Sequence, residues 1–231
     1  MSKDISQDRS NASSTSEQDE TFKWLQGLWA NSKTVSGEQE YYERSASEYE
    51  QIHQTLQWRA PELCMKAIAD YEEKSGVKLD QKGRCLDIGA GTGLSGEALR
   101  RAGFTGQVDA LEPVEGMFAQ AKKKNIYTEW FQEFLDDKKE SKIPSATYDL
   151  AVSVGVFNDR SAKSSCLTEV MRMIKPGGYL AAILREAHWK GDFEDEIKRL
   201  EDERILSLKH VDRSDVYYDN VSSMAFILQK N

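Results

Sequence analysis

The chain has 231 residues, of which 39% are hydrophobic, 10% aromatic and 30% charged, an ordinary globular composition. Its formal net charge of −8 argues against nucleic acid as a partner, because phosphate binding needs a basic surface. No apolar run approaches the roughly 18 residues of a membrane-spanning helix, and the first residues lack a signal-peptide pattern, so no membrane association is expected.

The three cysteines are widely spaced and odd in number: Cys64, Cys85 and Cys166. This arrangement matches neither a disulfide framework nor the spacing of metal ligands. We therefore expect no bound metal and a reducing, cytoplasmic compartment.

Residues 1–20 are almost entirely polar and cannot bury enough apolar surface to offset the entropy of ordering, which predicts a disordered tail. Residues 21–80 form a predicted helical N-terminal cap. Apolar residues recur there at helical spacing, first at Phe22 and Leu25 with Leu28 or Trp29.

A second helix is predicted to begin near Pro61, a residue favoured in the first turn, and to end at Gly76. One of its faces carries Leu63, Ala67, Ile68 and Tyr71.

Residues 81–231 form the predicted core, in which short apolar runs alternate with helical patterns. Strands are predicted over residues 84–88, 107–111, 127–134, 148–154, 179–184, 205–209 and 223–228. Helices are predicted over residues 94–102, 114–124, 166–174 and 193–200. This alternation predicts an α/β fold, a doubly wound, mostly parallel seven-stranded sheet covered on both faces. The last two strands have no helix between them, which predicts an antiparallel hairpin at one edge.

A glycine-rich loop, Asp87-Ile88-Gly89-Ala90-Gly91-Thr92-Gly93, joins the first predicted strand to the helix that follows. Glycines permit a tight turn and a close approach of the backbone to a ligand, and the helix behind them offers unpaired N–H groups. By itself such a loop is also compatible with a turn between a strand and a helix that binds no ligand.

Two acidic residues follow the next two predicted strands: Glu112 and Glu133. The carboxyl ends of adjacent parallel strands meet at one crevice, so both carboxylates are expected near the glycine loop. An acidic residue about twenty positions after such a loop accepts hydrogen bonds from ribose hydroxyls. The loop reads G-x-G-x-G and differs from the dinucleotide fingerprint, and the residues after Gly178 are too few for a second nucleotide-binding half.

These segments resemble the motifs of the class I S-adenosylmethionine-dependent methyltransferases. The loop 87–93 resembles their first motif, Leu111-Glu112-Pro113 their second, and Lys175-Pro176-Gly177-Gly178 a late motif before a strand. Three further segments, residues 42–50, 58–61 and 154–159, are similar to a narrower group of methyltransferase-like proteins.

The resemblance implies S-adenosylmethionine as cofactor and a role for each matching position. Gly89, Ala90 and Gly91 would follow the methionine part, and Asp87 would hold the loop and reach the amino group. Gly93 is a further cofactor-binding position of the same loop. Glu112 would bind the ribose hydroxyls.

The resemblance also assigns the adenine and the reacting methyl group. Pro113 and Met117 would lie against the adenine, and Glu133 and the backbone of Phe134 would contact its edge. Val154 and Gly155 would line the part of the site that holds the sulfonium and its methyl group. Two departures weaken the match: Leu111-Glu112-Pro113 lacks the common Gly-x-Asp form, and residues 136–142 form a longer, more charged link than is typical.

The N-terminal helical segment resembles a lid over the site, in which Tyr41, Tyr42 and Tyr49 either contact the substrate or only pack the segment onto the sheet. Arg59 either pairs with the cofactor carboxylate or is an ordinary surface arginine.

His188 follows the fifth predicted strand and is a candidate general base, although a plain loop histidine is the simpler interpretation. No Asn- or Asp-Pro-Pro-aromatic tetrad follows the fourth strand, which argues against methylation of adenine amines. The expected activity is methyl transfer, with a small molecule as acceptor. A protein acceptor, a catalytically inactive scaffold of this fold and a nicotinamide-dependent oxidoreductase remain as alternatives.

Overall fold

The computed structural model describes residues 35–158, 160–218 and 221–231. The tail predicted over residues 1–20 and the helix predicted around Phe22 and Leu25 lie outside the described residues.

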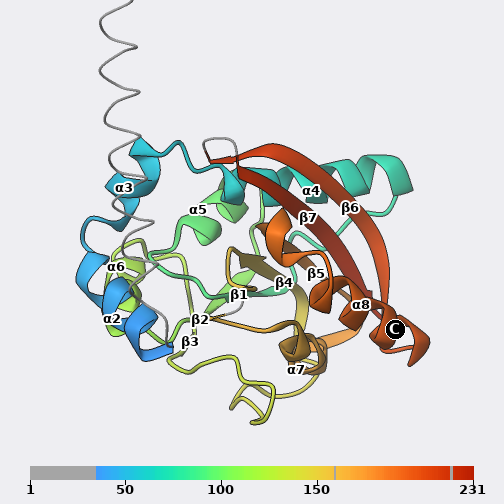
Figure 1. The fold of residues 1–231 in the computed structure, drawn as a ribbon. Coiled ribbons are helices and arrows are strands. Elements are labelled where there is room, and N and C mark those ends of the chain that lie inside the picture. Colours follow the sequence, from blue (N-terminus) through green and yellow to red (C-terminus); the bar gives the residue numbers. More distant parts are fainter. Residues whose placement is uncertain (1–34, 159, 219–220) are drawn as a thin grey trace, which may run out of the picture.

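The described residues form one seven-stranded sheet, in the order β3-β2-β1-β4-β5-β7-β6 (Figure 1). Its strands are β1 (Arg84–Ile88), β2 (Gln107–Leu111), β3 (Trp130–Phe131), β4 (Tyr148–Val154), β5 (Ile174–Arg185), β6 (Leu206–Tyr218) and β7 (Val221–Lys230). Strands β1 to β5 pair in parallel, whereas β7 pairs antiparallel with both β5 and β6. The predicted mostly parallel sheet with a C-terminal antiparallel hairpin is confirmed.

Helices and short 3-10 turns connect and cover these strands. They are α2 (Val35–Ser45), α3 (Tyr49–Thr55), α4 (Ala60–Ser75), α5 (Leu94–Arg101), α6 (Glu115–Lys122), η1 (Ser164–Cys166), α7 (Leu167–Met173), η2 (Glu186–His188) and α8 (Asp192–Asp202). The helix predicted from Pro61 to Gly76 is α4, and Gly76 ends it in a left-handed conformation with φ of 71°. Figure 1 shows α2 beside α6, at the end of the sheet remote from the β6–β7 hairpin.

The sheet separates two apolar cores, because successive strand residues point to opposite faces. Within β1, Cys85 joins the core formed with α4 and α5, whereas Leu86 joins the core formed with α7 and α8. Helix α8 is highly charged, and its buried residues are Phe193, Ile197 and Leu200. Helix α4 therefore belongs to the layer that covers the sheet, although it lies within the residues predicted as the cap.

The prediction for the third strand was too long. Only Trp130 and Phe131 pair, and their partners are Ala110 and Leu111, the last residues of β2. Since β2 ends there, residues 132–134 have no strand to pair with, and Glu133 lies two residues beyond β3.

Near the late motif, β5 begins earlier than predicted. Ile174 pairs with Tyr148, and the next pair joins Tyr179 to Leu150, so residues 175–178 form a bulge inside β5. Gly177 has φ of 80°, which suits glycine at such a bulge. The preceding helix consequently ends at Met173, and Ile174 belongs to the strand. The hairpin strands β6 and β7 both extend beyond their predicted ranges.

Candidate active site

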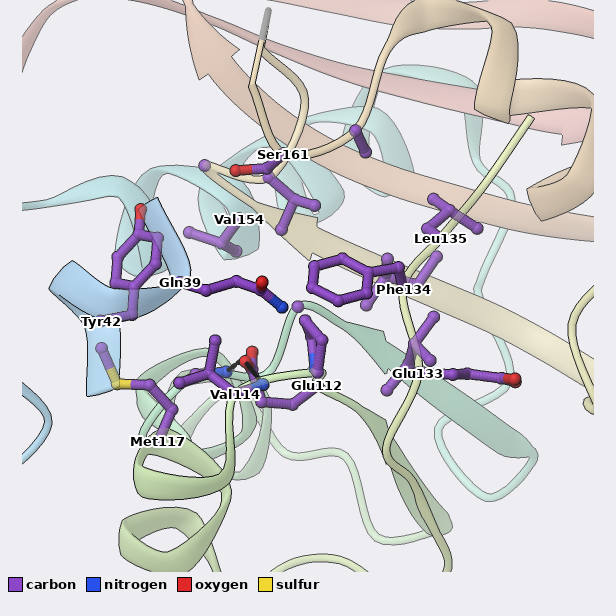
Figure 2. A pocket seen from close by; sticks show the side chains of 18 of the residues that line it. Gln39, Tyr42, Glu112, Val114, Met117, Glu133, Phe134, Leu135, Val154 and Ser161 are labelled. Atoms are coloured by element: carbon purple, nitrogen blue, oxygen red, sulfur yellow. Dashed lines mark hydrogen bonds between the residues drawn. The ribbon is translucent and has the colours of Figure 1, made fainter. Parts of the chain in front are cut away.

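A cavity lies at the carboxyl ends of β1, β2 and β4, under α2 (Figure 2). In this sheet the strand order reverses between β1 and β4, and ligands of open α/β sheets bind at that point. The lining residues are Gln39, Tyr42, Tyr49, Ile88, Gly89, Gly91, Leu111, Glu112, Pro113, Val114, Met117, Glu133, Phe134, Leu135, Val154, Gly155, Val156, Arg160, Ser161 and Ala162.

The structure brings together most of the residues predicted for the site. Those that line the cavity are Gly89, Gly91, Glu112, Pro113, Met117, Glu133, Phe134, Val154, Gly155, Tyr42 and Tyr49. Asp87, Ala90, Gly93, Arg59 and His188 are not among its lining residues. Sequence reasoning missed Gln39, Val114, Arg160 and Ser161, which no motif had marked, and gave no role to Val156, which lies in the resembling segment 154–159.

The glycine loop bends from β1 toward β2. The N–H groups of Gly89 and Ala90 donate to the carbonyl oxygen of Leu111, at 2.7 and 3.2 Å. Gly89 has φ of 66°, and a Cβ atom there would lie 2.3 Å from Cγ2 of Val156. Glycine is therefore required at position 89 both by the backbone conformation and by the wall opposite it.

Asp87 lies fully buried beneath this loop. Its Oδ2 accepts hydrogen bonds from Ser95 Oγ and Tyr127 OH, each at 2.6 Å. A Cβ atom at Gly96 would lie 2.4 Å from that tyrosine oxygen, so glycine makes room for it. Burial raises the pKa of Asp87 to about 6. Asp87 Oδ1 has no hydrogen-bond partner among the described residues.

Glu112 follows β2 and is 6% exposed. Its Oε2 accepts the Gly91 N–H at 2.9 Å and its Oε1 the Val114 N–H at 2.8 Å. Burial raises the pKa of Glu112 to about 7, although both N–H groups lower it. A carboxylate offers about four acceptor positions, so two remain for other donors at the cavity wall.

The side chain of Glu133 does not extend into the cavity, where the resemblance places it at the edge of the adenine. Its side chain points away from the cavity in Figure 2, and Oε1 accepts hydrogen bonds from Ser141 Oγ and from the Lys142 N–H. The long charged link noted in the sequence thus engages this carboxylate. Phe134, next to it, extends its ring into the cavity and is 40% exposed.

Helices α2 and α3 close one side of the cavity, where Figure 2 shows Gln39 and Tyr42 on α2 facing inward. The rings of Tyr42 and Tyr49 meet edge to face with centroids 6.1 Å apart. Tyr41 does not line the cavity: it is buried in the core, and its hydroxyl has no hydrogen-bond partner within the described part of the chain.

Polar contacts attach these two helices to the core. Glu43 on α2 accepts the N–H of Gly116, in the first turn of α6, at 2.8 Å. Lys124 contacts Glu50 of α3 and Glu97 of α5, each at 2.7 Å.

Arg59 and His188 lie away from the cavity. The Arg59 N–H donates to the Tyr217 carbonyl at 3.0 Å, and its exposed side chain borders a separate groove with His53, Trp58 and Leu94. His188 ends η2, beside another groove formed by Arg185, Glu186 and Lys190.

Comparison with known proteins adds independent findings. Residues 86–182 match a family model described as a methyltransferase domain, Methyltransf_11. Over 165 residues the chain is 28% identical to methyltransferase-like protein 27 of Homo sapiens, which covers 70% of this chain and 64% of that protein. The chain thus spans less than two thirds of that relative's length.

Two solved structures share the fold. A putative methyltransferase of Haloferax volcanii, in complex with the Trm112 methyltransferase activator, has a TM-score of 0.62 at 13% identity, covering 82% of this chain and 97% of that one. The Burkholderia thailandensis 1,6-didemethyltoxoflavin-N1-methyltransferase, with bound 1,6-didemethyltoxoflavin and S-adenosylhomocysteine, has a TM-score of 0.56 at 15% identity, covering 83% and 87%.

No helix in residues 35–158, 160–218 and 221–231 is both long and apolar enough to cross a membrane. The same residues contain no group of three or more His, Cys, Asp or Glu side chains arranged to hold a metal ion.

Proposed function

We propose that this chain transfers the methyl group of S-adenosylmethionine to a small-molecule acceptor. Its fold and its domain are those of the class I S-adenosylmethionine-dependent methyltransferases. The observation that carries the proposal is the cavity in which the Gly89–Gly91 loop, Glu112 and Val154 meet beneath α2.

The residues of the cavity suit S-adenosylmethionine. The cofactor's ribose hydroxyls match the remaining acceptor positions of Glu112, whereas Asp87, buried beneath the loop, would hold the loop and reach the ammonium group through water. The positive φ of Gly89 and Gly91 lets the backbone approach the methionine part closely. Pro113 and Met117 offer an apolar surface for the adenine, and Phe134 adds a ring to it.

When bound, the cofactor supplies a methyl group on a positively charged sulfur, which a nucleophile can attack directly. The protein's task is to align that nucleophile and exclude water. We propose that Val154 and Gly155, at the end of β4, line the site around the reacting methyl group. We propose that Tyr42 and Tyr49 cover that site. His188 lies outside the cavity, so we propose no general base.

The enclosure by α2 and α3 supports a small acceptor over a protein side chain, since Gln39 and Tyr42 occupy the approach to the cavity. A protein acceptor would require these helices to move aside. We place the enzyme in the cytoplasm, because Cys64, Cys85 and Cys166 are all buried and free.

Calorimetry with S-adenosylmethionine and S-adenosylhomocysteine tests cofactor binding. We expect both to bind the wild type, and Gly89→Arg to abolish binding, because no side chain fits between residue 89 and Val156. Gly103→Arg is the matched control, since a Cβ atom at Gly103 meets nothing within 4 Å and that glycine lies outside the cavity. Absence of wild-type binding at millimolar cofactor would refute the proposal.

Transfer itself is tested with cofactor labelled in the methyl group and a small-molecule extract. We expect labelled products with the wild type and none with Gly89→Arg. Binding without any labelled product would favour the inactive scaffold instead. Label appearing only in macromolecules would favour a protein acceptor.

A further inference from the structure

Gln39 is a polar residue of the cap that the cofactor assignment does not use. It lies on α2, lines the cavity and is half-buried. Figure 2 shows its side chain extending from α2 into the cavity, with the amide toward Phe134 on the facing wall. Within the described part of the chain this amide makes no hydrogen bond. A primary amide has two donor hydrogens and an acceptor oxygen, so Gln39 can both donate and accept inside the cavity.

The packing of α2 determines that Gln39 faces inward. Steps of three and four residues separate Gln39, Tyr42 and Ala46, which places them on one side of the helical segment. Tyr42 and Ala46 pack against the start of α6. Glu43, one turn after Gln39, accepts the N–H of Gly116 at 2.8 Å. The helix is thus oriented by its neighbours, and the Gln39 amide is not needed to hold it there.

The other polar side chains that line the cavity already have partners. Glu112 accepts two backbone N–H groups, and Glu133 is hydrogen-bonded to the charged link that follows it. Four more have interactions of their own: Tyr42, Tyr49, Arg160 and Ser161. Among the described lining residues, Gln39 is therefore the one whose side-chain donors and acceptor are all uncommitted.

The cavity walls near the proposed position of the methyl group are apolar or aromatic. Val154 and Val156 come from the end of β4, and the rings of Tyr42 and Tyr49 come from the cap. Aromatic walls favour a flat body. A charged group placed here would need an opposite charge to offset its loss of water, and a neutral amide supplies none. An uncharged group that donates or accepts hydrogen bonds is the match for Gln39.

We propose that the methyl acceptor is a flat molecule with an uncharged polar group, such as a carboxamide or a ring lactam, and that the Gln39 amide binds this group. Gln39 selects and orients the acceptor through hydrogen bonds and takes no proton from it. This inference rests on the proposed methyl transfer and specifies its substrate class.

The test uses the full chain saturated with S-adenosylhomocysteine and three probes that share one ring: the neutral benzamide, the anion benzoate and the cation benzylamine. Ligand-observed NMR and calorimetry measure their binding at about pH 8, where a carboxylate is ionised and an amine is protonated. We expect the wild type to bind benzamide about tenfold more tightly than either charged probe, the effect of one well-placed hydrogen bond.

Two substitutions of Gln39 have different expected results. Gln39→Leu removes the hydrogen bonds and should weaken benzamide binding about tenfold. Gln39→Glu introduces a negative charge of nearly the same shape and should change the preference from benzamide to benzylamine. The matched controls are Gln51→Leu and Gln51→Glu, because Gln51 is an exposed glutamine of α3 that does not line the cavity. Both controls should keep the wild-type preference, and all four variants should keep the affinity for S-adenosylhomocysteine, which also shows that they fold.

The inference is overturned if a charged probe binds the wild type as tightly as benzamide, if no probe binds at millimolar concentration, or if Gln39→Leu keeps the wild-type affinity for benzamide. A loss of S-adenosylhomocysteine affinity in Gln39→Leu but not in Gln51→Leu would also overturn it, because the amide would then bind the cofactor. Failure of the wild type to bind S-adenosylhomocysteine refutes the proposed function itself, and so is distinguishable from failure of this inference.

Discussion

At the scale of single residues, the site depends on two buried carboxylates that the fold keeps next to the same loop. Glu112 holds the loop through the Gly91 N–H, and Asp87 lies beneath it with Ser95 and Tyr127. Desolvation raises the pKa of both, to about 7 for Glu112 and about 6 for Asp87. Ligand groups that donate hydrogen bonds reverse this effect, because they favour the ionised form.

Cofactor binding should therefore depend on pH. A ribose hydroxyl needs the ionised form of Glu112, so the affinity of the wild type for S-adenosylmethionine should fall as the pH drops through about 7. In Glu112→Gln the affinity at alkaline pH should be about tenfold lower, and the remaining pH dependence should move to about 6, the pKa of Asp87. Calorimetry at a series of pH values measures this. Glu115→Gln, on the first turn of α6, is the control; an unchanged midpoint in Glu112→Gln would contradict the assignment.

The raised pKa of Glu112 also affects the stability of the unliganded protein, which should fall as the pH rises, whereas cofactor affinity should increase. Folded Glu112 keeps its proton up to a pH of about 7, whereas the unfolded chain loses it near 4.5. Its contribution to stability is therefore fully present below 4.5 and is lost as the pH rises through about 7. In thermal unfolding without ligand, the melting temperature should fall less between pH 4.5 and about 7 in Glu112→Gln than in the wild type.

The sequence predicted Gly89, Glu112 and Pro113 as cavity residues because they stand at fixed positions in motifs. It did not predict Arg160 or Gln39, since neither belongs to a periodic pattern. The N–H groups of Arg160 and Ser161 donate to Oδ1 of Asn158 in the loop after β4. Such a loop is defined by side-chain geometry that spacing alone does not encode.

At the scale of secondary structure, α2 and α3 are attached to the core by a small number of polar contacts. Glu43 caps α6 through Gly116, and Lys124 joins Glu50 to Glu97. Apolar contacts accompany them: Tyr41 of α2 and Ile52 of α3 are buried in the larger core, and Ala46 packs with Val114 and Met117 in a small separate cluster. The polar contacts lie at the surface, so they can be removed without disturbing this burial.

We predict that weakening these contacts accelerates exchange of the cofactor. In the double variant Glu43→Ala, Glu50→Ala, the amides of α2 and α3 should exchange hydrogen faster, and S-adenosylhomocysteine should dissociate several-fold faster. The stability of the sheet should change by less than about 1 kcal/mol, as is usual for exposed ion pairs. Hydrogen exchange with mass spectrometry and stopped-flow measurement test this.

Glu40→Ala is the control for the cap, because Glu40 pairs with Arg44 on the exposed face of α2. Equal dissociation rates in the wild type and the double variant would show that α2 and α3 do not limit release of the cofactor.

The strands β1, β2 and β4 could be predicted from the sequence because each is a short apolar run within a fully covered part of the sheet. Strand β3 could not, since its length depends on where its neighbour β2 ends. The start of β5 was missed because residues 175–178 form a bulge, whereas Lys-Pro-Gly-Gly ordinarily indicates a break between elements.

At the scale of the whole molecule, the sheet is stabilised by two cores, and the hairpin contributes to both. Phe226 of β7 is fully buried against Trp189 and Phe193, with ring centroids 5.2 and 5.4 Å away. Phe226→Ala should lower the free energy of unfolding by about 3–5 kcal/mol, the usual cost of removing a buried ring. Chemical denaturation measures this loss.

Val211→Ala, in the neighbouring strand β6, is the comparison, because Val211 is 43% exposed and should cost little. Equal stability of the two variants would show that the hairpin is not part of the folding core.

The position of β7 also determines when the sheet can be completed during synthesis on the ribosome. Every residue that lines the cavity precedes residue 163, yet β6 pairs only with β7, which is made after it and inserts between β5 and β6. A nascent chain that ends before Val221 therefore exposes the β5 edge and a thirteen-residue β6 without its partner. Such unpaired edges promote aggregation, so the chain depends on rapid emergence of its last strand.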